Sequence, residues 1–314
     1  MNASKPKVTI MIPTYNQEQY IAEAIESALA QDYENLEVLV TDDCSTDHTG
    51  DIAKRYLNHP NFRYVRNEHN LGRVGNYHST LYNHAIGDWV VNLDGDDYYN
   101  DSHYISRAMN RIAGYPNLVC YFARKYMAPQ IKKYKSNKID TDCYLFRGTD
   151  YFKKYFQIGG FAHAGAFYRR DVAIKDGLCY TFSAIQSDFH AIIRLSLYGD
   201  IIFARDKGYT WRTHANNTSL TANPVGKFQQ EIECQKRIAQ DSKNGALSDK
   251  EWGQWLNEGE KAAYRQYVND CLTLSPSFKS LWLGLRNFRF NLSFSILYIK
   301  SVLTTLRIHK FFNK

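Results

Sequence analysis

The fold is decided near the start of the chain, where residues 8–46 read VTIMIPTYNQEQYIAEAIESALAQDYENLEVLVTDDCST. Residues 8–13 are an apolar, β-branched run that is long enough for a buried strand and too short for a helix. Apolar side chains then recur at helical spacing between residues 18 and 31, and residues 36–41 form a second apolar run. A strand, a helix and a strand in close succession are typical of a parallel sheet covered by helices.

The same alternation continues along the chain. The further elements that the pattern predicts are helices at 47–57, 76–85 and 183–198 and strands at 62–65, 88–93 and 201–204. Residues 115–170 show no clear period, and the Lys-rich stretch 125–138 is expected to be a loop. From residue 227 the pattern is helical. The sequence therefore predicts an α/β fold with a mostly parallel sheet and helices on both faces, followed by a helical C-terminal region.

The basic charge of the chain is concentrated in its C-terminal tail. The net charge is +7, and residues 271–314 contain seven Lys or Arg and no Asp or Glu, so the rest of the chain is neutral overall. Read as a helix, the tail places apolar residues on one stripe with basic residues beside it. The stripe consists of Leu281, Leu285, Phe288, Leu292, Ile296, Ile299, Leu303 and Leu306. This pattern favours an interfacial helix on an anionic membrane.

The alternative for the tail is packing on the rest of the chain or in a homo-oligomer. Nucleic acid is not an expected partner, because the basic positions flank an apolar stripe instead of forming a polar face. Six scattered cysteines without a CxxC pair predict free thiols in a reducing compartment. No signal-peptide pattern or apolar run of about 18 residues is present. The expected location is therefore cytoplasmic, peripheral on the inner face of the cell membrane.

Polar clusters follow three of the predicted strands, at residues 14–16, 42–47 and 94–97. Ligands of such sheets bind beyond the carboxyl ends of the strands. The cluster Asp94-Gly95-Asp96-Asp97 brings together carboxylates whose repulsion a divalent cation would relieve, and oxygen ligands suit Mn²⁺ or Mg²⁺. A solvated acidic turn is the alternative interpretation. Three clusters at one edge are stronger evidence for a binding site than any one of them.

Two further features are weaker signals. Asp42 suits a contact to a nucleotide base or ribose and equally a structural role, whereas Asp47 suits a cap of the following helix. Residues 70–76, NLGRVGN, place two glycines and Arg73 before a predicted helix, where they could meet phosphate. The chain has no GxxxxGK[ST] loop and no GxGxxG after the first strand, which excludes the usual NTPase and dinucleotide motifs.

Taken together, three stretches closely resemble glycosyltransferase family 2, whose members are inverting enzymes with the GT-A fold. These are the run IMIPTYNQEQYIAEAIESALAQDYENLEVLVTDDCSTDHT, then NEHNLGRVGN, then LDGDDYY. The resemblance is clear over residues 7–101 and continues more loosely through His214, and it does not cover the tail. It implies a GT-A catalytic domain at residues 1–224, with a nucleotide-sugar part to about 114 and an acceptor part at 115–224, and a helical region at 225–314.

The resemblance also implies roles for single residues. The nucleotide-sugar-binding residues would be Pro13, Thr14, Tyr15, Asp42, Arg73, Asn76, Asp94 and Gly95. Asp96 would bind Mn²⁺ or Mg²⁺ as part of the DxD motif, and His214, within the Arg-x-His-x-x-Asn pattern at 212–217, would join it. The catalytic base would be Asp188. The family usually has an acid directly before this base, and Ser187 stands there instead.

The expected function is transfer of a single sugar from a nucleoside-diphosphate sugar, a UDP-sugar by preference, to a hydroxyl of a glycan or lipid-linked acceptor in surface polysaccharide synthesis. The QxxRW pattern of processive synthases is missing. One alternative is a sugar nucleotidyltransferase, which would usually carry a Gly- and Lys-rich loop after the first strand, where this chain has PTYN. The other is a non-catalytic scaffold, against which the intact Asp94, Asp96, Asp188 and His214 argue.

Overall fold

The computed structural model describes most of the chain. The described residues are 5–124, 131, 138–159, 161, 163–177, 179–182, 186–206, 208–214, 224–242 and 245–274. The chain divides into two compact units, Met1–His214 and Ala215–Lys314. The sequence-based boundary after residue 224, and the functions assigned to the parts, stay predictions.

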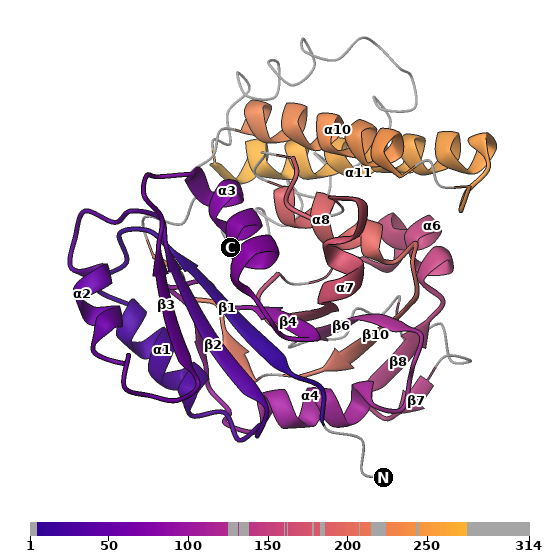
Figure 1. Cartoon of the computed structure of the whole chain (residues 1–314). Helices are drawn as coiled ribbons and strands as arrows, with labels where there is room; N and C mark the ends of the chain where they lie inside the picture. The colour runs from indigo at the N-terminus through magenta and orange to yellow at the C-terminus, as the bar shows by residue number, and fades with distance from the viewer. Residues whose placement is uncertain are drawn as a thin grey trace, which may run out of the picture. The chain divides into compact units, whose positions relative to one another are not determined.

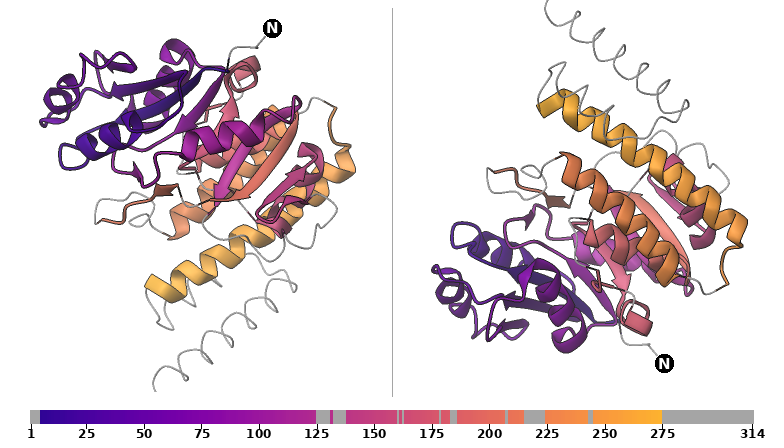
Figure 2. Two further views of the ribbon diagram at one scale, coloured as in Figure 1. Left: turned by 90° about the horizontal axis from the view of Figure 1, so that it is seen from below. Right: turned by 90° about the horizontal axis from the view of Figure 1, so that it is seen from above.

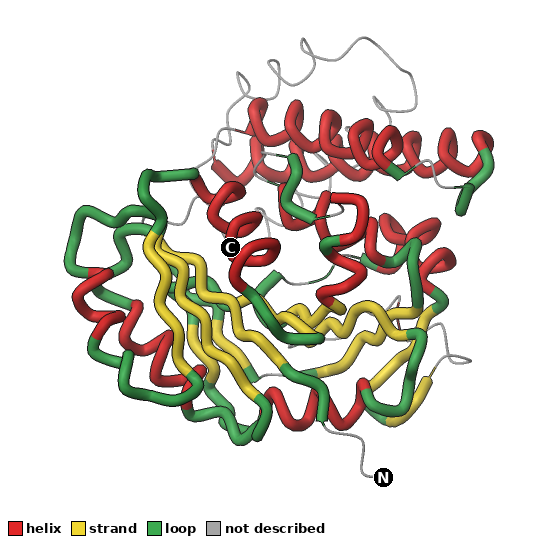
Figure 3. The backbone as a smooth tube through the Cα atoms, in the orientation of Figure 1, coloured by secondary structure: helices red, strands yellow, loops and turns green. Residues whose placement is uncertain are grey.

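The first unit is built on a large mixed sheet (Figures 1 and 3). Its strands are β1 Val8–Thr14, β2 Leu36–Asp42, β3 Phe62–Arg66, β4 Trp89–Asn92, β6 Leu118–Arg124, β7 Lys138–Asp140, β8 Cys143–Phe146, β9 Ala166–Arg169 and β10 Asp200–Arg205. Their order in the sheet is β3-β2-β1-β4-β9-β6-β10-β8-β7. Neighbours from β3 to β4 are parallel, as are β6 and β10, whereas β9 is antiparallel to β4 and β6. A separate pair joins β5 Tyr98–Tyr99 to β11 Tyr209–Thr210 in antiparallel fashion.

Helices cover both faces of this sheet, as the alternating pattern predicts. They are α1 Ile21–Leu29, α2 Thr49–Lys54, α3 Gly72–Ser79, the π-helix η1 Thr80–His84, α4 Tyr104–Ile112, α6 Gly148–Ile158, α7 Arg170–Ala173, the 3₁₀ turn η3 Lys175–Gly177 and α8 Ser187–Leu195. In Figure 1, α1, α2 and α4 lie on one face, and α3 and α8 on the other. The apolar sides of α1 and α4 form one core with alternate side chains of the strands, among them Ile10, Val38 and Phe167.

Two local differences from the sequence-based prediction affect the site. Helix α3 begins at Gly72, not at residue 76, so Arg73 and Gly75 lie inside the helix and not before it. Gly72 has φ of +75°, which glycine adopts without strain, and the side chain of Asn70 accepts a hydrogen bond from the Gly72 N–H at 2.9 Å. Residues 115–170, for which the sequence pattern predicts no helix or strand, contain β6, β7, β8, α6 and β9. Most of the predicted loop at 125–138 falls outside the described residues.

The second unit contains two long helices, α10 Pro224–Asp241 and α11 Asp249–Leu274, which lie side by side (Figure 2). The rings of Phe228 and Tyr267 meet between the helices with centroids 5.6 Å apart, and Gln235 donates to the Gly259 carbonyl at 3.2 Å. In the described part of the chain, no helix combines the length and the apolar character needed to cross a bilayer. The predicted apolar stripe of the tail, from Leu281 onward, lies outside the described residues.

Candidate active site

The polar clusters predicted from the sequence meet at one edge of the sheet. Strands β2, β1 and β4 are parallel neighbours, with Thr14 opposite Asp42 and Met11 opposite Asn92. The segments that follow them therefore leave the sheet at the same edge. This is the carboxyl end of the strands, where ligands bind in open parallel sheets.

The acidic cluster after β4 is compact. Asp94, Asp96 and Asp97 each offer an oxygen, and these oxygens lie within 4.8 Å of one another. Burial and the charge of Asp94 raise the pKa of Asp96, and the same two causes raise the pKa of Asp97 to about 8. Oδ2 of Asp97 is buried and has no hydrogen-bond partner among the described residues. Crowded, poorly solvated carboxylates of this kind fit a divalent cation with oxygen ligands.

His214 reaches this cluster from the far end of the first unit. The β5–β11 pair places the segment after Thr210 next to residues 96–97, and Nε2 of His214 lies 2.7 Å from Oδ2 of Asp96. The imidazole ring stacks on Tyr20, with the ring centroids 5.0 Å apart. An imidazole in contact with a carboxylate is a common pair of metal ligands, so the structure brings together the two residues predicted to bind metal.

Arg212 makes hydrogen bonds to both Asp96 and Asp97. Its N–H donates to Oδ1 of Asp97 at 2.9 Å, and its Nε–H donates to the Asp96 carbonyl at 2.9 Å. The guanidinium group lies 5.0 Å from the ring centroids of both Tyr20 and Tyr98, which is the arrangement of a cation–π contact. These contacts orient Asp96 and Asp97 without occupying Oδ2 of either.

Gly95 is required by the close approach of the loop after β1. A Cβ atom at this position would lie 2.2 Å from Oε1 of Gln17 and 2.8 Å from Oγ1 of Thr14. The Thr14 hydroxyl itself donates to Gln17 at 2.6 Å. Of the other residues predicted near the nucleotide in this loop, Pro13 is buried within β1 and Tyr15 is exposed. Thr14 and Gly95 thus pack directly against each other, and Tyr15 presents its ring to solvent at the same edge.

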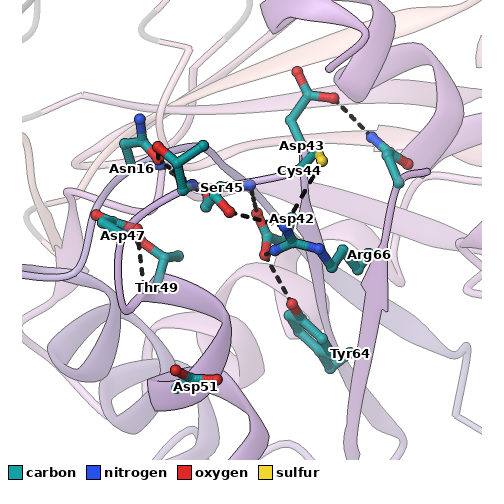
Figure 4. Close-up of polar contacts among 12 residues, drawn as sticks. Asn16, Asp42, Asp43, Cys44, Ser45, Asp47, Thr49, Asp51, Tyr64 and Arg66 are labelled. Carbon is teal, nitrogen blue, oxygen red and sulfur yellow. Dashed lines mark hydrogen bonds and ion pairs between the residues drawn. The ribbon is translucent and has the colours of Figure 1, made fainter. Parts of the chain in front are cut away.

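Asp42 is fully buried and its carboxylate is used within the protein (Figure 4). Oδ1 accepts from the Ser45 N–H at 2.8 Å, and Oδ2 accepts from the Tyr64 hydroxyl at 2.7 Å and from Arg66 at 2.8 Å. Burial and the bond to Asp42 raise the pKa of Tyr64 to about 12. These contacts support a structural role, which was one of the two interpretations that the sequence left open.

The neighbouring Asp43 points away from Asp42 in Figure 4. Its Oδ1 accepts from the Asn67 side chain at 2.9 Å and from the Leu71 N–H at 2.8 Å, so it fixes the start of the NLGRVG segment. Asn67 also donates to Oδ1 of Asn76, and Asn76 donates to the Thr41 carbonyl at 2.9 Å. Asn76, a predicted nucleotide contact, is therefore a buried link between α3 and β2.

Arg73, in the segment NLGRVGN at residues 70–76, lies close to the helix that carries the predicted base Asp188. Arg73 is exposed on α3 and donates to the Ser187 hydroxyl at 3.1 Å, and Ser187 is the first residue of α8. Asp188 follows it in the first helical turn and is partly exposed. The structure thus places Arg73 beside the start of the helix that carries Asp188, although 114 residues separate Arg73 from Ser187.

Two residues near the acidic cluster were missed from the sequence. Tyr77 donates a short hydrogen bond to Oδ1 of Asp94, and Nε2 of His163 lies 2.9 Å from the Tyr77 hydroxyl oxygen. Neither residue belongs to a motif. His163 lies just before β9, in a stretch of sequence whose pattern predicts no helix or strand. It comes close to Asp94 because β9 pairs with β4 in antiparallel fashion.

Comparison with known proteins identifies the family of the chain. The family model for glycosyl transferase family 2 matches residues 9–177. Over 96 residues the chain is 40% identical to poly(ribitol-phosphate) beta-N-acetylglucosaminyltransferase TarS of Staphylococcus aureus and 41% identical to the putative glycosyltransferase EpsE of Bacillus subtilis. Each match covers 30% of this chain, but only 17% of TarS and 34% of EpsE.

Solved structures show the same fold. Residues 1–349 of S. aureus TarS in complex with UDP-GlcNAc align with a TM-score of 0.66 and 21% identity, over 88% of this chain and 77% of that one. The mannosyltransferase PcManGT of Pyrobaculum calidifontis in complex with GDP-Man and Mn²⁺ aligns with a TM-score of 0.60 and 16% identity, over 96% and 85%. With more than half of its length matched by the family model, the chain belongs to glycosyl transferase family 2 and has its GT-A-like fold.

Proposed function

We propose that this chain is a metal-dependent, inverting glycosyltransferase that moves one sugar from a nucleoside-diphosphate sugar to a hydroxyl of a glycan or lipid-linked acceptor in surface polysaccharide synthesis. The observation that carries the proposal is the Asp94–Asp96–Asp97 cluster with His214 2.7 Å from Asp96, at the carboxyl edge of a parallel sheet. A solvated acidic turn does not need a histidine delivered from a distant segment. The family assignment supports the same reaction class.

The family and its relatives support a choice of donor class. TarS has been solved with UDP-GlcNAc and with UDP, and PcManGT with GDP-Man and Mn²⁺. We therefore expect a UDP-sugar as the first choice for this chain and a GDP-sugar as the second. A cation bound by Asp96 and His214, with Asp94 or Asp97 beside them, would neutralise the charge that develops on the diphosphate leaving group.

The base is proposed to be Asp188. It lies in the first turn of α8 and is partly exposed, so an acceptor hydroxyl can reach its carboxylate. Asp188 would take the proton of the acceptor hydroxyl while the oxygen of that hydroxyl forms a bond to C1 of the donor sugar and the bond from C1 to the diphosphate oxygen breaks. A single displacement of this kind inverts the anomeric centre. The bond from Arg73 to Ser187 would fix the start of the helix during this step.

For the nucleoside, the contacts favour Asp43 over Asp42. Both oxygens of Asp42 are occupied by Ser45, Tyr64 and Arg66, whereas the hydrogen bonds that described residues make to the Asp43 carboxylate use Oδ1. Oδ2 of Asp43 is therefore the better acceptor for a base N–H or a ribose hydroxyl. Asp42 would act indirectly, by shaping the loop that presents its neighbour.

The test is a panel of UDP- and GDP-sugars incubated with the protein and Mn²⁺, with release of nucleoside diphosphate as the measurement. We expect one donor to be hydrolysed slowly, to raise the melting temperature, and to lose both effects in excess EDTA and in Asp96→Ala. Release of pyrophosphate from a nucleoside triphosphate and a sugar 1-phosphate would instead identify a nucleotidyltransferase. Binding of no donor in the panel would contradict the proposal.

A further inference from the structure

A network of hydrogen bonds among four buried side chains and the half-buried His163 supports the first carboxylate of the acidic cluster. We call it the Asp94 support network, and its members are Tyr77, Asn92, His163, Tyr168 and Tyr180. The Tyr77 hydroxyl donates to Oδ1 of Asp94, and Nε2 of His163 lies 2.9 Å from the same hydroxyl oxygen. On its other side, Nδ1 of His163 lies 3.4 Å from the amide nitrogen of Asn92.

The chemistry of these groups fixes the direction of each bond. Tyr77 has one hydroxyl proton, which it gives to Asp94, so its oxygen accepts from His163. His163 must then carry a proton on Nε2. The Asn92 amide nitrogen can only donate, so Nδ1 of His163 accepts and carries no proton. The network therefore requires a neutral imidazole in the Nε2–H tautomer.

The remaining bonds close without conflict. Asn92 gives its second amide proton to the Tyr180 hydroxyl at 3.0 Å and accepts from the Tyr168 hydroxyl at 3.1 Å. Tyr180 then donates to Tyr168 at 3.3 Å. Each hydroxyl and amide proton of the network thus has one acceptor. A network satisfied at every member holds its groups in one arrangement.

The surroundings keep this arrangement rigid. Tyr77 and Tyr180 are each 3% exposed, Asn92 and Tyr168 are fully buried, and the rings of Tyr77 and Tyr180 stack with centroids 4.9 Å apart. Burial and the charge of Asp94 raise the pKa of Tyr77 well above its ordinary value of 10. The hydroxyl therefore stays protonated and serves as a hydrogen-bond donor to Asp94. Tyr180 has φ of +56°, a costly backbone conformation for a tyrosine, which its side-chain contacts hold in place.

We propose that Tyr77 and His163 are positioning residues, which orient the Asp94 carboxylate toward the nucleotide diphosphate and its cation. The inference rests on the proposed function. Tyr77 occupies one oxygen of Asp94 and stops the carboxylate from rotating, and His163 stops the Tyr77 hydroxyl from turning away. Without this support Asp94 would sample several rotamers, and part of the binding free energy would be lost in ordering it again.

The first test is Tyr77→Phe, which keeps the ring that stacks on Tyr180 and removes only the hydroxyl. Affinity for UDP in the presence of Mn²⁺ is measured by calorimetry, and the donor KM and kcat separately. A hydrogen bond to a charged group corresponds to roughly a tenfold change or more, so we expect about tenfold weaker binding of UDP with Mn²⁺. The matched control is Tyr33→Phe, which removes a buried hydroxyl bonded to the Pro6 carbonyl at 2.7 Å, and it should bind like the wild type.

The outcomes separate the two proposals. If the wild type binds no nucleotide, the proposed function fails, and this inference fails with it. If the wild type binds UDP with Mn²⁺ and Tyr77→Phe binds it equally well with an unchanged KM, only the positioning role is refuted. An equal loss of affinity in Tyr33→Phe and Tyr77→Phe would also refute it, because the effect would then be a general loss of stability.

His163 provides an independent test that does not depend on the folding of Tyr77→Phe. His163→Gln keeps a side-chain N–H that can reach the Tyr77 hydroxyl, whereas His163→Leu keeps none. We expect His163→Gln to retain UDP affinity within about threefold and His163→Leu to lose about as much as Tyr77→Phe. Nitrogen NMR of histidine-labelled wild-type protein should show the Nε2–H tautomer for the signal that His163→Gln removes. An Nδ1–H tautomer or an imidazolium at neutral pH would overturn the proposed direction of the bonds.

Discussion

Nε2 of His214 lies 2.7 Å from Oδ2 of Asp96, although 118 residues separate the two in the sequence. The short β5–β11 pair explains the contact, because it returns the chain to the strand directly after the acidic cluster. Tyr20, which directly precedes α1, stacks on the ring of His214. The segments that carry Tyr20, Asp96 and His214 therefore meet at one point of the first unit. This convergence makes Asp96 the first residue to test.

Asp96→Ala should abolish sugar transfer and leave the fold intact. The change removes the carboxylate that His214 contacts, and it reduces the repulsion that raises the pKa of Asp97, so the metal-free protein should be at least as stable as the wild type. Donor turnover and the melting temperature in EDTA are the two measurements. Full activity of the variant, or of the wild type in excess EDTA, would refute a metal-assisted reaction.

Asp188→Asn should lower the turnover rate by about 10²-fold or more and retain donor binding, because it keeps the volume of the side chain and removes the proton acceptor. The comparison of kcat with the affinity for the donor separates these effects. Asp171→Asn is the control, since Asp171 is exposed and pairs with Arg169 on the surface. Normal turnover by Asp188→Asn would place the base elsewhere.

The stability of the metal-free protein should fall as pH rises from 5 to 8. Asp97 has a pKa of about 8 in the folded protein and an ordinary value of 3.8, so between these values the folded state binds more protons than the unfolded state. Its contribution is therefore present at low pH and lost as pH rises through 8. Asp97→Asn should flatten this pH dependence and stabilise the protein at pH 8 by on the order of 2 kcal/mol. Melting curves in EDTA at pH 5.5 and 8 test it, and equal slopes for both proteins would contradict it.

The two adjacent aspartates after β2 should respond differently to the same substitution. Asp43→Asn should weaken nucleotide binding and change the melting temperature little. Asp42→Asn weakens the hydrogen bonds that the buried carboxylate accepts from Tyr64 and the partly exposed Arg66, and should lower the free energy of unfolding by about 2 kcal/mol. Urea unfolding and UDP calorimetry on both variants measure the contrast. If Asp42→Asn lost nucleotide affinity at full stability, the original assignment of Asp42 as a nucleotide contact would be restored.

The sequence predicts that the tail beyond α11 attaches the protein to an anionic membrane. The full chain should float with anionic liposomes at low salt, and a version ending at Leu274 should not, because it lacks the apolar stripe and its basic neighbours. High salt should weaken the flotation of the full chain. Equal recovery of both versions would favour packing of the tail in the protein or in a homo-oligomer.

Much of the fold follows from local pattern, and the site follows only in part. The strands at 8–14, 36–42 and 89–92 are continuous apolar runs, so their type and their shared edge could be predicted. The acidic cluster could be recognised because its members are adjacent in sequence. Tyr77 and His163 could not, since each is an ordinary residue until the sheet order brings β9 beside β4. Asp42 and Asp43 show the same limit, because residue type and position do not tell which of the two buried carboxylates has both oxygens bonded within the protein.

The reversed strand β9 has a consequence for how the candidate site can change. Every parallel strand delivers to the site the residues that follow it, whereas β9 delivers those that precede it. The segment before β9, which carries His163, is therefore separate in sequence from the aspartates after β4 whose support it completes. Randomising His163 in a laboratory evolution experiment would therefore change the support of Asp94 through Tyr77 and leave the acidic sequence after β4 untouched.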